Sequence, residues 1–194
     1  MFKVTSFIFL YMQRNKRIVI SGSPGAGKTS IIMGLKDKGY SVFEEFSRSL
    51  IKNSIIKKKS NLFLSNPIGF SKNLLTIREK QYDASEKLVH SKQQVVFYDR
   101  GLHDIYAYLK ATDNDTHFFK KKIYSFKYDL VFLARPWKEI FKRDSERLES
   151  FEQAEMYYPF IKKTYEKYHK VIELPEVSIE KRVFFIESFI KKYG

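Results

Sequence analysis

Short apolar runs recur along the chain, separated by longer segments in which apolar residues follow a helical spacing. The runs are rich in β-branched and aromatic residues and lie at 17–21, 41–44, 94–99, 129–134 and 170–174. Runs of this length predict strands that are buried on both faces of a sheet. The segments between and after them predict helices at 29–38, 45–56, 70–91, 104–110, 138–143, 151–168 and 178–192. Strands that alternate with helices indicate right-handed crossovers, and hence an α/β fold with a mostly parallel sheet covered on both faces.

Residues that begin and end regular structure agree with this pattern. Gly39 follows the first predicted helix, where a left-handed residue ends a helix, and Ser178 precedes the last one as an N-cap. Residues 57–71 are predicted to form one long irregular connection, with Asn66 and Pro67 as breakers. Connections of this length in ligand-binding domains often cover a substrate.

The composition is that of one globular domain with a basic surface. A chain of 194 residues has the size of one domain, which we place at residues 17–194. Residues 1–16 are interpreted as an N-terminal extension, either disordered or an artefact of an early start. The formal net charge is +14, but Lys and Arg are spread along the whole chain. This distribution indicates a solvated surface with weak general attraction for anions, and no specific nucleic-acid partner is predicted.

Two absences restrict the class further. The sequence holds no cysteine, which excludes disulfides and cysteine-ligated metal sites and fits a reducing compartment. The apolar stretch near the N-terminus spans about nine residues, which is too short to cross a bilayer, so no transmembrane segment is predicted. The predicted location is therefore cytoplasmic.

The stretch GSPGAGKT fits the pattern G-x-x-x-x-G-K-[ST] and lies between a predicted strand and a predicted helix. Glycines allow a backbone whose N–H groups surround phosphates, Lys28 adds a cation at the β- and γ-phosphates, and Thr29 offers a hydroxyl to Mg²⁺. ATP and Mg²⁺ are the expected ligands. The predicted nucleotide-binding residues are Gly22, Ser23, Pro24, Gly25, Ala26, Gly27, Lys28, Thr29 and Ser30.

The identity of the base is less constrained. No [NT]-K-x-D motif for guanine occurs, and NKRI has Ile18 where the aspartate would stand, which argues against a Ras-type GTPase. We therefore favour ATP over GTP.

The stretch VVFYDRG delivers Asp99 to the end of a predicted strand, beside the expected phosphates. Such an aspartate holds Mg²⁺ directly or through water in P-loop proteins; the alternative is an aspartate that caps the turn after the strand. Arg100 is predicted either to face a substrate phosphate or to pair with a carboxylate.

Two further pairs of residues are candidates for catalysis. Glu45 and Arg48 fall at i, i+3 on a predicted helix, where a carboxylate can accept a proton from an acceptor hydroxyl and an arginine can hold the substrate. A surface ion pair is the alternative. Arg143 and Arg147 fall four residues apart after the fourth strand, where they would belong to a lid that closes over the nucleotide, or to a solvated helix face. Trp137 is expected to pack in the core.

These motifs resemble the P-loop family that includes the ribosylnicotinamide kinase domain of NadR and the TRP-channel translocation-defect proteins, often labelled AAA family ATPase. The resemblance runs from about Lys16 to the C-terminus and rests on SGSPGAGKTS, GYSVFEEFSRSLI, REKQYDASEK, VVFYDRGLHDIYAYL, DLVFLARPWKEIFKRDSERLES, a tyrosine-rich helix and IELPEVSIEKRVFFI. It implies a P-loop NTPase fold, a three-layer α/β/α sandwich with five strands in the order 2-3-1-4-5, kinase-like with a lid. On the acceptor side it suggests Glu45, Arg48, Arg78, Arg100 and Asp104.

The resemblance implies no single reaction, because members of the family differ in substrate. Glu44-Glu45 stands where the family usually has Pro-Glu, a departure at the acceptor pocket. One hypothesis is an enzyme that transfers the γ-phosphoryl group of Mg·ATP to an unidentified small acceptor, a nucleoside or nucleotide-like molecule, with Glu45 or Asp104 taking the acceptor proton. The alternative is a nucleotide-dependent switch that controls a protein or lipid partner.

Overall fold

The computed structural model describes residues 14–47, 65–88, 92–114, 116–141 and 149–193. Its centre is a five-stranded sheet in the order β2-β3-β1-β4-β5, in which every neighbouring pair is parallel. The strands are β1 (Lys16–Gly22), β2 (Ser41–Phe43), β3 (Val95–Asp99), β4 (Leu130–Ala134) and β5 (Val171–Glu173). The five predicted strands and the order implied by the family resemblance are confirmed.

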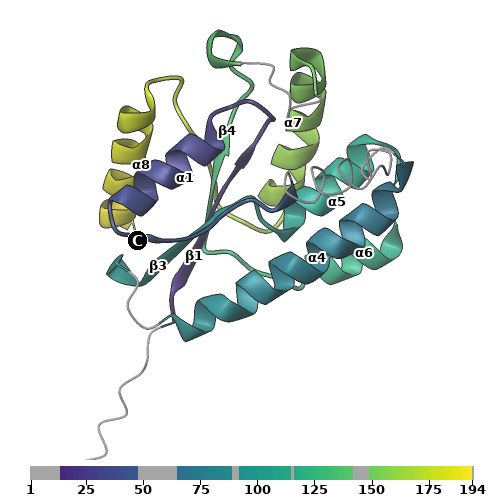
Figure 1. The fold of residues 1–194 in the computed structure, drawn as a ribbon, viewed down its shortest axis with the longest axis horizontal. Helices are drawn as coiled ribbons and strands as arrows, with labels where there is room; N and C mark the ends of the chain where they lie inside the picture. The colour runs from purple at the N-terminus through teal and green to yellow at the C-terminus, as the bar shows by residue number, and fades with distance from the viewer. Residues whose placement is uncertain (1–13, 48–64, 89–91, 115, 142–148, 194) are drawn as a thin grey trace, which may run out of the picture.

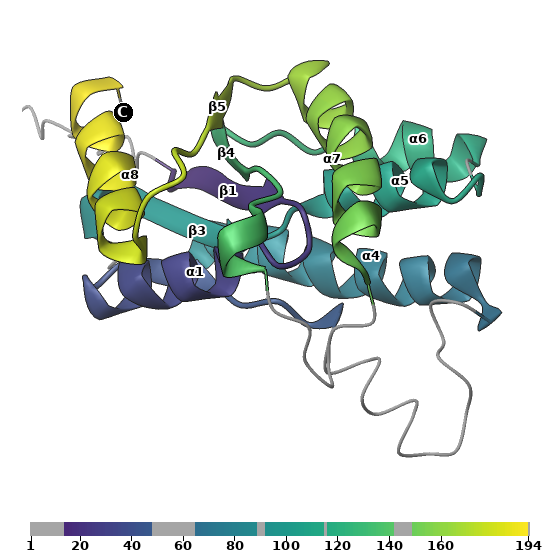
Figure 2. The same ribbon diagram turned by 90° about the horizontal axis from the view of Figure 1, so that it is seen from above.

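Helices cover both faces of this sheet, as Figures 1 and 2 show. The helices α1 (Lys28–Asp37) and α8 (Ile179–Tyr193) pack on one face, against the alternate strand residues Ile18, Ile20, Phe97 and Phe132. The opposite face is covered by α4 (Pro67–Ala84), α5 (Leu102–Ala111), α6 (His117–Ile123) and α7 (Phe151–Glu166). The chain therefore forms the predicted three-layer α/β/α sandwich, and the continuous apolar runs of β1, β3 and β4 follow from burial on both sides.

The predicted irregular connection at 57–71 is wrong at its C-terminal end. Residues 67–71 are helical, because Pro67 occupies the first turn of α4 and the Asn66 side chain accepts a hydrogen bond from the amide of Gly69 at 2.8 Å. Proline lacks only an N–H that has no partner in a first turn, and asparagine is a favoured N-cap. The two residues taken as breakers thus begin a helix. Residues 57–64 lie outside the described residues.

Other boundaries also differ from the sequence prediction. The helix α6 was not predicted; Thr116 caps it by accepting from the amide of Phe119, and its seven residues are too few to show a periodic pattern. The helix predicted at 70–91 ends at Ala84 and continues only as the 3₁₀ turn 85–87. Of the helix predicted at 138–143, residues Lys138–Ile140 form a 3₁₀ turn.

Arg14 and Asn15, just before β1, contact the body of the fold. Arg14 donates to both carboxylate oxygens of Asp129, at 2.7 and 2.8 Å, and Asn15 donates to the carbonyls of Ser85 and Leu88. Residues 1–13 lie outside the described residues.

Parallel pairing brings the functional segments to one edge of the sheet. Ile20 of β1 pairs with Asp99 of β3, and Gly22 pairs with Ala134 of β4. Since the strands are parallel, the turn after β1, the end of β3 and the start of α5 meet at the carboxyl edge, the usual ligand position in open α/β sheets.

Candidate active site

The turn between β1 and α1 is built for close backbone approach. Gly22 has φ of 124°, and a Cβ there would lie 2.0 Å from the carbonyl oxygen of Ala134, so any side chain would collide with β4. Gly25 and Gly27 also adopt left-handed φ values, 77° and 80°. The helix α1 begins at Lys28, so the positive end of its dipole adds to the amides of this phosphate loop.

Lys28 lies inside the loop. Its side chain is buried, and Nζ donates to the carbonyl of Ser23. Burial, and next the positive charge of Arg100, lower the pKa of Lys28 to about 7, against the nearby carboxylates that favour its charged form. A polyphosphate beside Lys28 would add negative charge and so favour the ammonium form.

Thr29 and Asp99 fit the predicted metal pair. Thr29 Oγ1 donates to Asp99 Oδ2 at 3.0 Å, while Oδ1 of Asp99 is buried with no hydrogen-bond partner among the described residues. Burial, and next the charge of Glu45, raise the pKa of Asp99 to about 6. A hydroxyl and an unsatisfied carboxylate oxygen at the phosphate loop are the oxygen donors that Mg²⁺ takes, so the residues present fit this ion.

Arg100 joins the two carboxylates of the acceptor side. Its Nε donates to Glu45 Oε1 at 2.8 Å, and Nη1 donates to Asp104 Oδ1 at 3.1 Å and to the carbonyl of Gly22 at 3.2 Å. The residue has φ of 69°, an uncommon value outside glycine that is often found at functional sites. Of the two predicted roles for Arg100, the structure shows pairing with carboxylates.

Glu45 is held in its ionised form. Burial opposes ionisation, but the charges of Arg100 and Lys28 and a hydrogen bond from Ser47 outweigh it and lower the pKa of Glu45 to about 2. Both hydrogen bonds, from Arg100 and from Ser47, use Oε1. Oε2 is therefore the oxygen through which Glu45 can engage a bound molecule.

Asp104 is the centre of a buried network. Its Oδ1 accepts from Ser21 at 2.6 Å as well as from Arg100, and its Oδ2 accepts from the amide of Gly101 at 2.9 Å and from the Tyr165 hydroxyl at 2.6 Å. Arg78, which donates to the carbonyl of Gly101, lies 3.9 Å from Oδ2. Burial is outweighed by these cations and hydrogen bonds, which lower the pKa of Asp104. Both oxygens of Asp104 are thus engaged twice, one of the contacts being that with Arg100.

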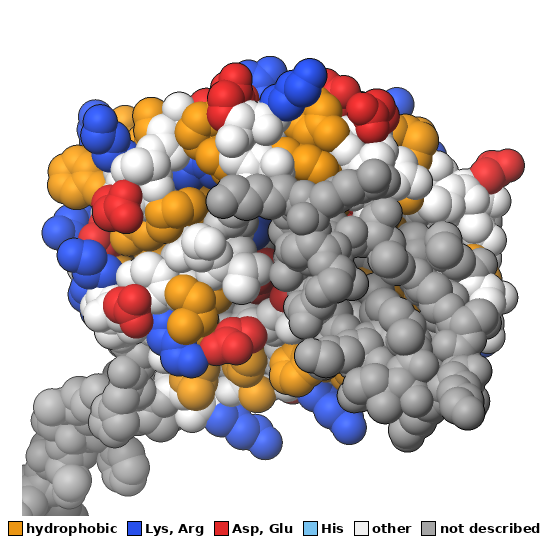
Figure 3. Space-filling model, turned by 45° about the horizontal axis from the view of Figure 1, so that its top comes forward, with side chains coloured by type: hydrophobic (Ala, Val, Ile, Leu, Met, Phe, Trp, Pro, Cys, Tyr) orange, Lys and Arg blue, Asp and Glu red, His pale blue; other side chains and the backbone are white. Residues whose placement is uncertain are grey.

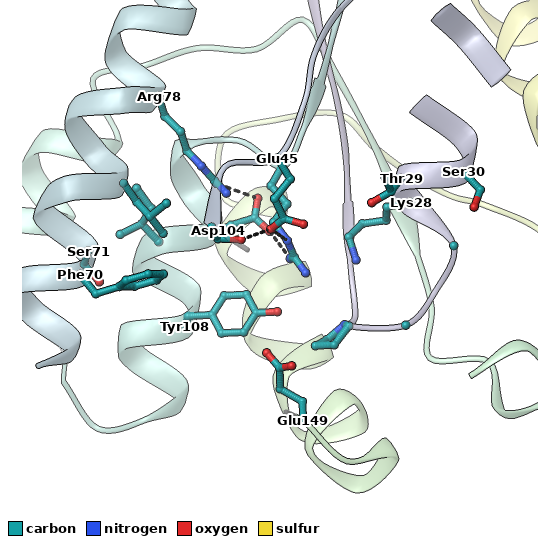
Figure 4. Close-up of a pocket in the computed structure, with 17 residues that line it drawn as sticks. Lys28, Thr29, Ser30, Glu45, Phe70, Ser71, Arg78, Asp104, Tyr108 and Glu149 are labelled. Carbon is teal, nitrogen blue, oxygen red and sulfur yellow. Dashed lines mark hydrogen bonds and ion pairs between the residues drawn. The ribbon is translucent and has the colours of Figure 1, made fainter. Parts of the chain in front are cut away.

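A cavity of about 350 Å³ joins the phosphate loop to these charged groups. The phosphate-loop side includes Lys28 and Thr29, and Figure 4 shows Glu45 between this side and an apolar wall; Arg100 also lines the cavity. In Figure 4, Phe70 of α4 and Tyr108 of α5 lie on the side opposite Lys28 and Thr29. The wall consists of Phe70, Leu74, Ile105 and Tyr108. One end of the cavity thus suits phosphates and the other suits a flat apolar group.

Most of the predicted site residues meet in this cavity. Those that line it are Pro24, Gly25, Gly27, Lys28, Thr29, Ser30, Glu45, Arg78, Arg100 and Asp104. Gly22, Ser23, Ala26 and Asp99 are buried and do not line it. Arg48, Arg143 and Arg147 lie outside the described residues. Trp137, expected in the core, is only partly buried and stacks on the Arg182 guanidinium at 4.8 Å.

The sequence prediction missed the apolar wall. Phe70, Leu74 and Arg78 are spaced four residues apart on α4, and on α5 Tyr108 follows Asp104 at the same spacing. This spacing places each set on one helix face. The signal was present in the predicted helix at 70–91, but that helix overlapped the predicted irregular connection at Phe70, and no wall residue was predicted as a site residue.

Behind Asp104 lies a buried pair of histidines. The His103 and His169 rings are 4.4 Å apart, and His103 also packs against Tyr165 at 5.1 Å. Neither ring nitrogen of His103 has a hydrogen-bond partner among the described residues. Burial, and next the neighbouring His169, lower the pKa of His103 to about 3. His103 is therefore neutral in the folded protein at physiological pH.

The surface agrees with a dispersed basic charge. On the face in Figure 3, blue Lys and Arg side chains alternate with acidic and apolar ones.

Among the described residues, no helix is long and apolar enough to span a bilayer.

The strand order, the G-x-x-x-x-G-K-T loop after β1 and the aspartate at the end of β3 define a P-loop NTPase with a kinase-like fold. A family model described as an AAA domain, AAA_28, matches residues 17–182, and the chain belongs to this family. This confirms the predicted P-loop family, while the likeness to the ribosylnicotinamide kinase domain remains a prediction. No curated protein matches the chain.

Solved structures share the fold at low sequence identity. Deoxyadenosine kinase from M. mycoides, with the products dCMP and dCDP bound, is 19% identical with a TM-score of 0.65, over 91% of this chain and 99% of that chain. The same kinase with bound dATP has a TM-score of 0.61. Thymidylate kinase from Candida albicans is 16% identical with a TM-score of 0.61, over 92% of each chain.

Proposed function

We propose that this protein transfers the γ-phosphoryl group of ATP to a hydroxyl or phosphate of a small nucleoside- or nucleotide-like acceptor. The observation that carries the proposal is the cavity itself, in which a phosphate loop faces an aromatic and apolar wall across an ionised glutamate. The volume of about 350 Å³ lies within the range of about 300–1,000 Å³ usual for small-molecule sites. The kinase-like fold agrees with this assignment.

In this proposal, Gly22 to Ser30 hold the triphosphate, and Lys28 contacts its β- and γ-phosphates. Asp99 and Thr29 would hold Mg²⁺, which when bound supplies positive charge to the phosphate oxygens. The acceptor lies against the wall that contains Phe70 and Tyr108, where a nucleobase can stack on an aromatic ring. Arg78 and Arg100 border the same cavity and suit an anionic or hydroxyl-bearing acceptor.

Glu45 would orient the attacking hydroxyl through Oε2 and take its proton. The oxygen–hydrogen bond of the acceptor breaks as the new oxygen–phosphorus bond forms. The bond between the γ-phosphorus and the oxygen that bridges it to the β-phosphorus breaks, and ADP leaves with that oxygen and the electron pair. A pKa near 2 makes Glu45 a weak base, so the proton moves late, when the attacking oxygen is already bonded to phosphorus. Asp104, with both oxygens engaged, is assigned to positioning Arg100 instead.

Acceptor-dependent release of ADP tests this function. Purified protein with Mg·ATP is supplied with a panel of nucleosides and nucleoside monophosphates, and we expect at least one acceptor to raise ADP release above the basal rate. Glu45→Gln should slow that turnover about 10²-fold, at the lower end of general-base effects, with unchanged ATP affinity. The matched control is Glu44→Gln, because Glu44 is exposed and pairs with Lys36 at the surface. Equal turnover in Glu45→Gln would contradict the role of Glu45, and no response to any acceptor would favour the nucleotide-dependent switch.

A further inference from the structure

Arg182 is a buried arginine whose partners lie in the phosphate loop and in the segment after β4. It stands in the first turn of α8, is 2% exposed, and its Nη1 donates to the carbonyl of Ala26 at 2.9 Å. Its guanidinium lies 4.8 Å from the centre of the Trp137 ring. Among the described residues no carboxylate lies within 4.0 Å of the Arg182 guanidinium. Burial lowers the pKa of Arg182 and the charge of Glu176 opposes this only in part, so direct charge pairing does not explain its burial.

The hydrogen bond to Ala26 has a geometric consequence for the next residue. The chain contains no cis peptide among the described residues, so the Ala26–Gly27 peptide is trans and planar. In such a peptide the carbonyl oxygen and the following N–H point in opposite directions. Because the Ala26 carbonyl is drawn toward α8, the Gly27 N–H is turned away from α8.

The cavity lies on that opposite side. Gly27 lines it, whereas Ala26 is fully buried and does not. A Cβ at Gly27 would lie 3.3 Å from Ile179 and 3.7 Å from Arg182 Nη1, which shows that α8 packs directly against this peptide. Gly27 has φ of 80°, and glycine resists rotation of its flanking peptides less than any other residue. An external contact is therefore needed to hold the peptide in one orientation.

The other end of the loop is anchored separately. Ser23 Oγ donates to the carbonyl of Ala154 in α7 at 2.9 Å, and the Ala26 amide donates back to the Ser23 carbonyl at 3.4 Å. The Trp137 ring faces the guanidinium, a cation–π contact that fixes the direction of its N–H groups. The loop is thus held by α7 at its start and by α8 at its end.

We propose that Arg182 is a positioning residue that fixes the Ala26–Gly27 peptide so that the Gly27 amide is aimed at a phosphate of the bound nucleotide. The inference rests on the proposed nucleotide binding, and it assigns control of one anion-binding donor to a residue of the last helix that was not among the predicted site residues. Preorganised backbone donors of this kind bind anions well because no reorientation is needed when the ligand arrives.

The test compares three variants. Arg182→Met keeps the bulk but loses the donor; Arg182→Lys keeps a charged donor on a shorter side chain. The matched control Lys181→Met removes one charge from the neighbouring, exposed position of α8. Calorimetry with tripolyphosphate and with ATP measures binding, and the backbone amide resonance of Gly27 reports the orientation of the peptide.

We expect Arg182→Met to lower the affinity for both ligands about tenfold, the order expected for one hydrogen bond to a charged group. The Gly27 amide resonance of the free protein should also shift. Arg182→Lys should lower the affinity for both ligands by a smaller factor. The affinity of Lys181→Met should lie within about twofold of that of the wild type because surface charge is screened. If acceptor-dependent turnover is present, KM for ATP should rise while kcat changes little, since the contact exists in ground and transition states alike.

The outcomes separate this inference from the proposed function. A wild-type protein that binds neither tripolyphosphate nor ATP contradicts the function. If the wild type binds these ligands, and Arg182→Met binds them equally well with an unchanged Gly27 resonance, the role of Arg182 is contradicted but the proposed function is not. A loss of affinity in Lys181→Met equal to that in Arg182→Met would mean that Arg182 acts only through its long-range charge, which also contradicts its positioning role. If Arg182→Met does not fold, Arg182→Lys decides the question by the same two measurements.

Discussion

The buried carboxylate of Asp104 gives a prediction that tests whether its hydrogen-bond and charge network stabilises the fold. In Asp104→Asn, Arg78 at 3.9 Å loses its carboxylate partner, and Arg100 at 3.1 Å loses one of its two, keeping only Glu45. The new amide also turns donors toward at least one of the groups that donate to Asp104. Removing one partner of a buried ion pair costs about 3–5 kcal/mol, so we expect a loss of that size.

That loss is large for a domain of this size. Total stabilities are about 5–15 kcal/mol, and each kcal/mol lowers the melting temperature by about 2–4 °C in domains of this length, so a drop of about 10 °C is expected. Tyr165→Phe removes only the hydroxyl that donates to Asp104 and should cost about 1–2 kcal/mol. Asp83→Asn, on the exposed side of α4, is the surface control and should change stability by less than about 0.5 kcal/mol.

Urea unfolding followed by circular dichroism measures these differences. The lowered pKa of Asp104 determines the pH dependence of these differences. The contribution of the Asp104 charge to the free energy of unfolding is fully present above pH 3.8, its ordinary pKa, and is lost as the pH falls through the lower pKa of the folded state. The wild type and Asp104→Asn should therefore converge in acid. A loss under about 1 kcal/mol at pH 7, or one no larger than in Tyr165→Phe, would refute the network as the reason for the burial of Asp104.

The remaining predictions concern the nucleotide, the lid and the core. Lys28→Ala should abolish tight ATP binding by calorimetry with the fold intact, because it removes a phosphate contact and little packing; unchanged affinity would contradict it. Arg143→Ala/Arg147→Ala should lose far more turnover than ATP affinity if these arginines close on the transferred group, whereas parallel losses would indicate a solvated helix face. The pKa of His103 is lowered to about 3, so stability is complete above its ordinary pKa of 6.5 and is lost as the pH falls toward 3. Between pH 8 and 5 the wild type should lose about 2 kcal/mol more than His103→Phe, by urea unfolding at each pH; equal losses would contradict a buried neutral imidazole.

The sheet could be predicted because each strand carries its own signal. The central strands β1, β3 and β4 are buried on both faces and therefore need uninterrupted apolar runs. The edge strands β2 and β5 are three residues long and only partly buried, yet each still carries β-branched or aromatic residues. Helix boundaries were less certain because the same residues can end one element or begin another. Asn66 and Pro67 are an example, since only the hydrogen bond from the Gly69 amide shows that they begin α4.

The phosphate loop could be predicted for a different reason. Its function depends on backbone geometry at fixed spacing, so residue types at fixed positions identify it. Glycine stands where φ is positive or a Cβ would collide, as at Gly22, and lysine and threonine stand at the start of the helix. The role of Asp104 depends instead on Ser21 and Tyr165, which are 83 and 61 residues away along the chain. No spacing rule connects them, so the sequence left Glu45 and Asp104 as equal candidates for the proton acceptor.

The same distinction explains why the acceptor remains a proposal while the nucleotide end follows from a motif. Every nucleoside triphosphate presents the same phosphate chain, and backbone amides suffice to bind it, so one loop sequence serves the whole class. The proposed acceptor would instead meet side chains from separate elements, Phe70 and Leu74 on α4 and Tyr108 on α5, whose relative positions depend on how the helices pack. Exchanging one wall residue can change the acceptor without disturbing the loop. Substrate identity in this fold must therefore be established by supplying acceptors to the protein, with substitutions at Phe70 and Tyr108 expected to alter KM for the acceptor and not for ATP.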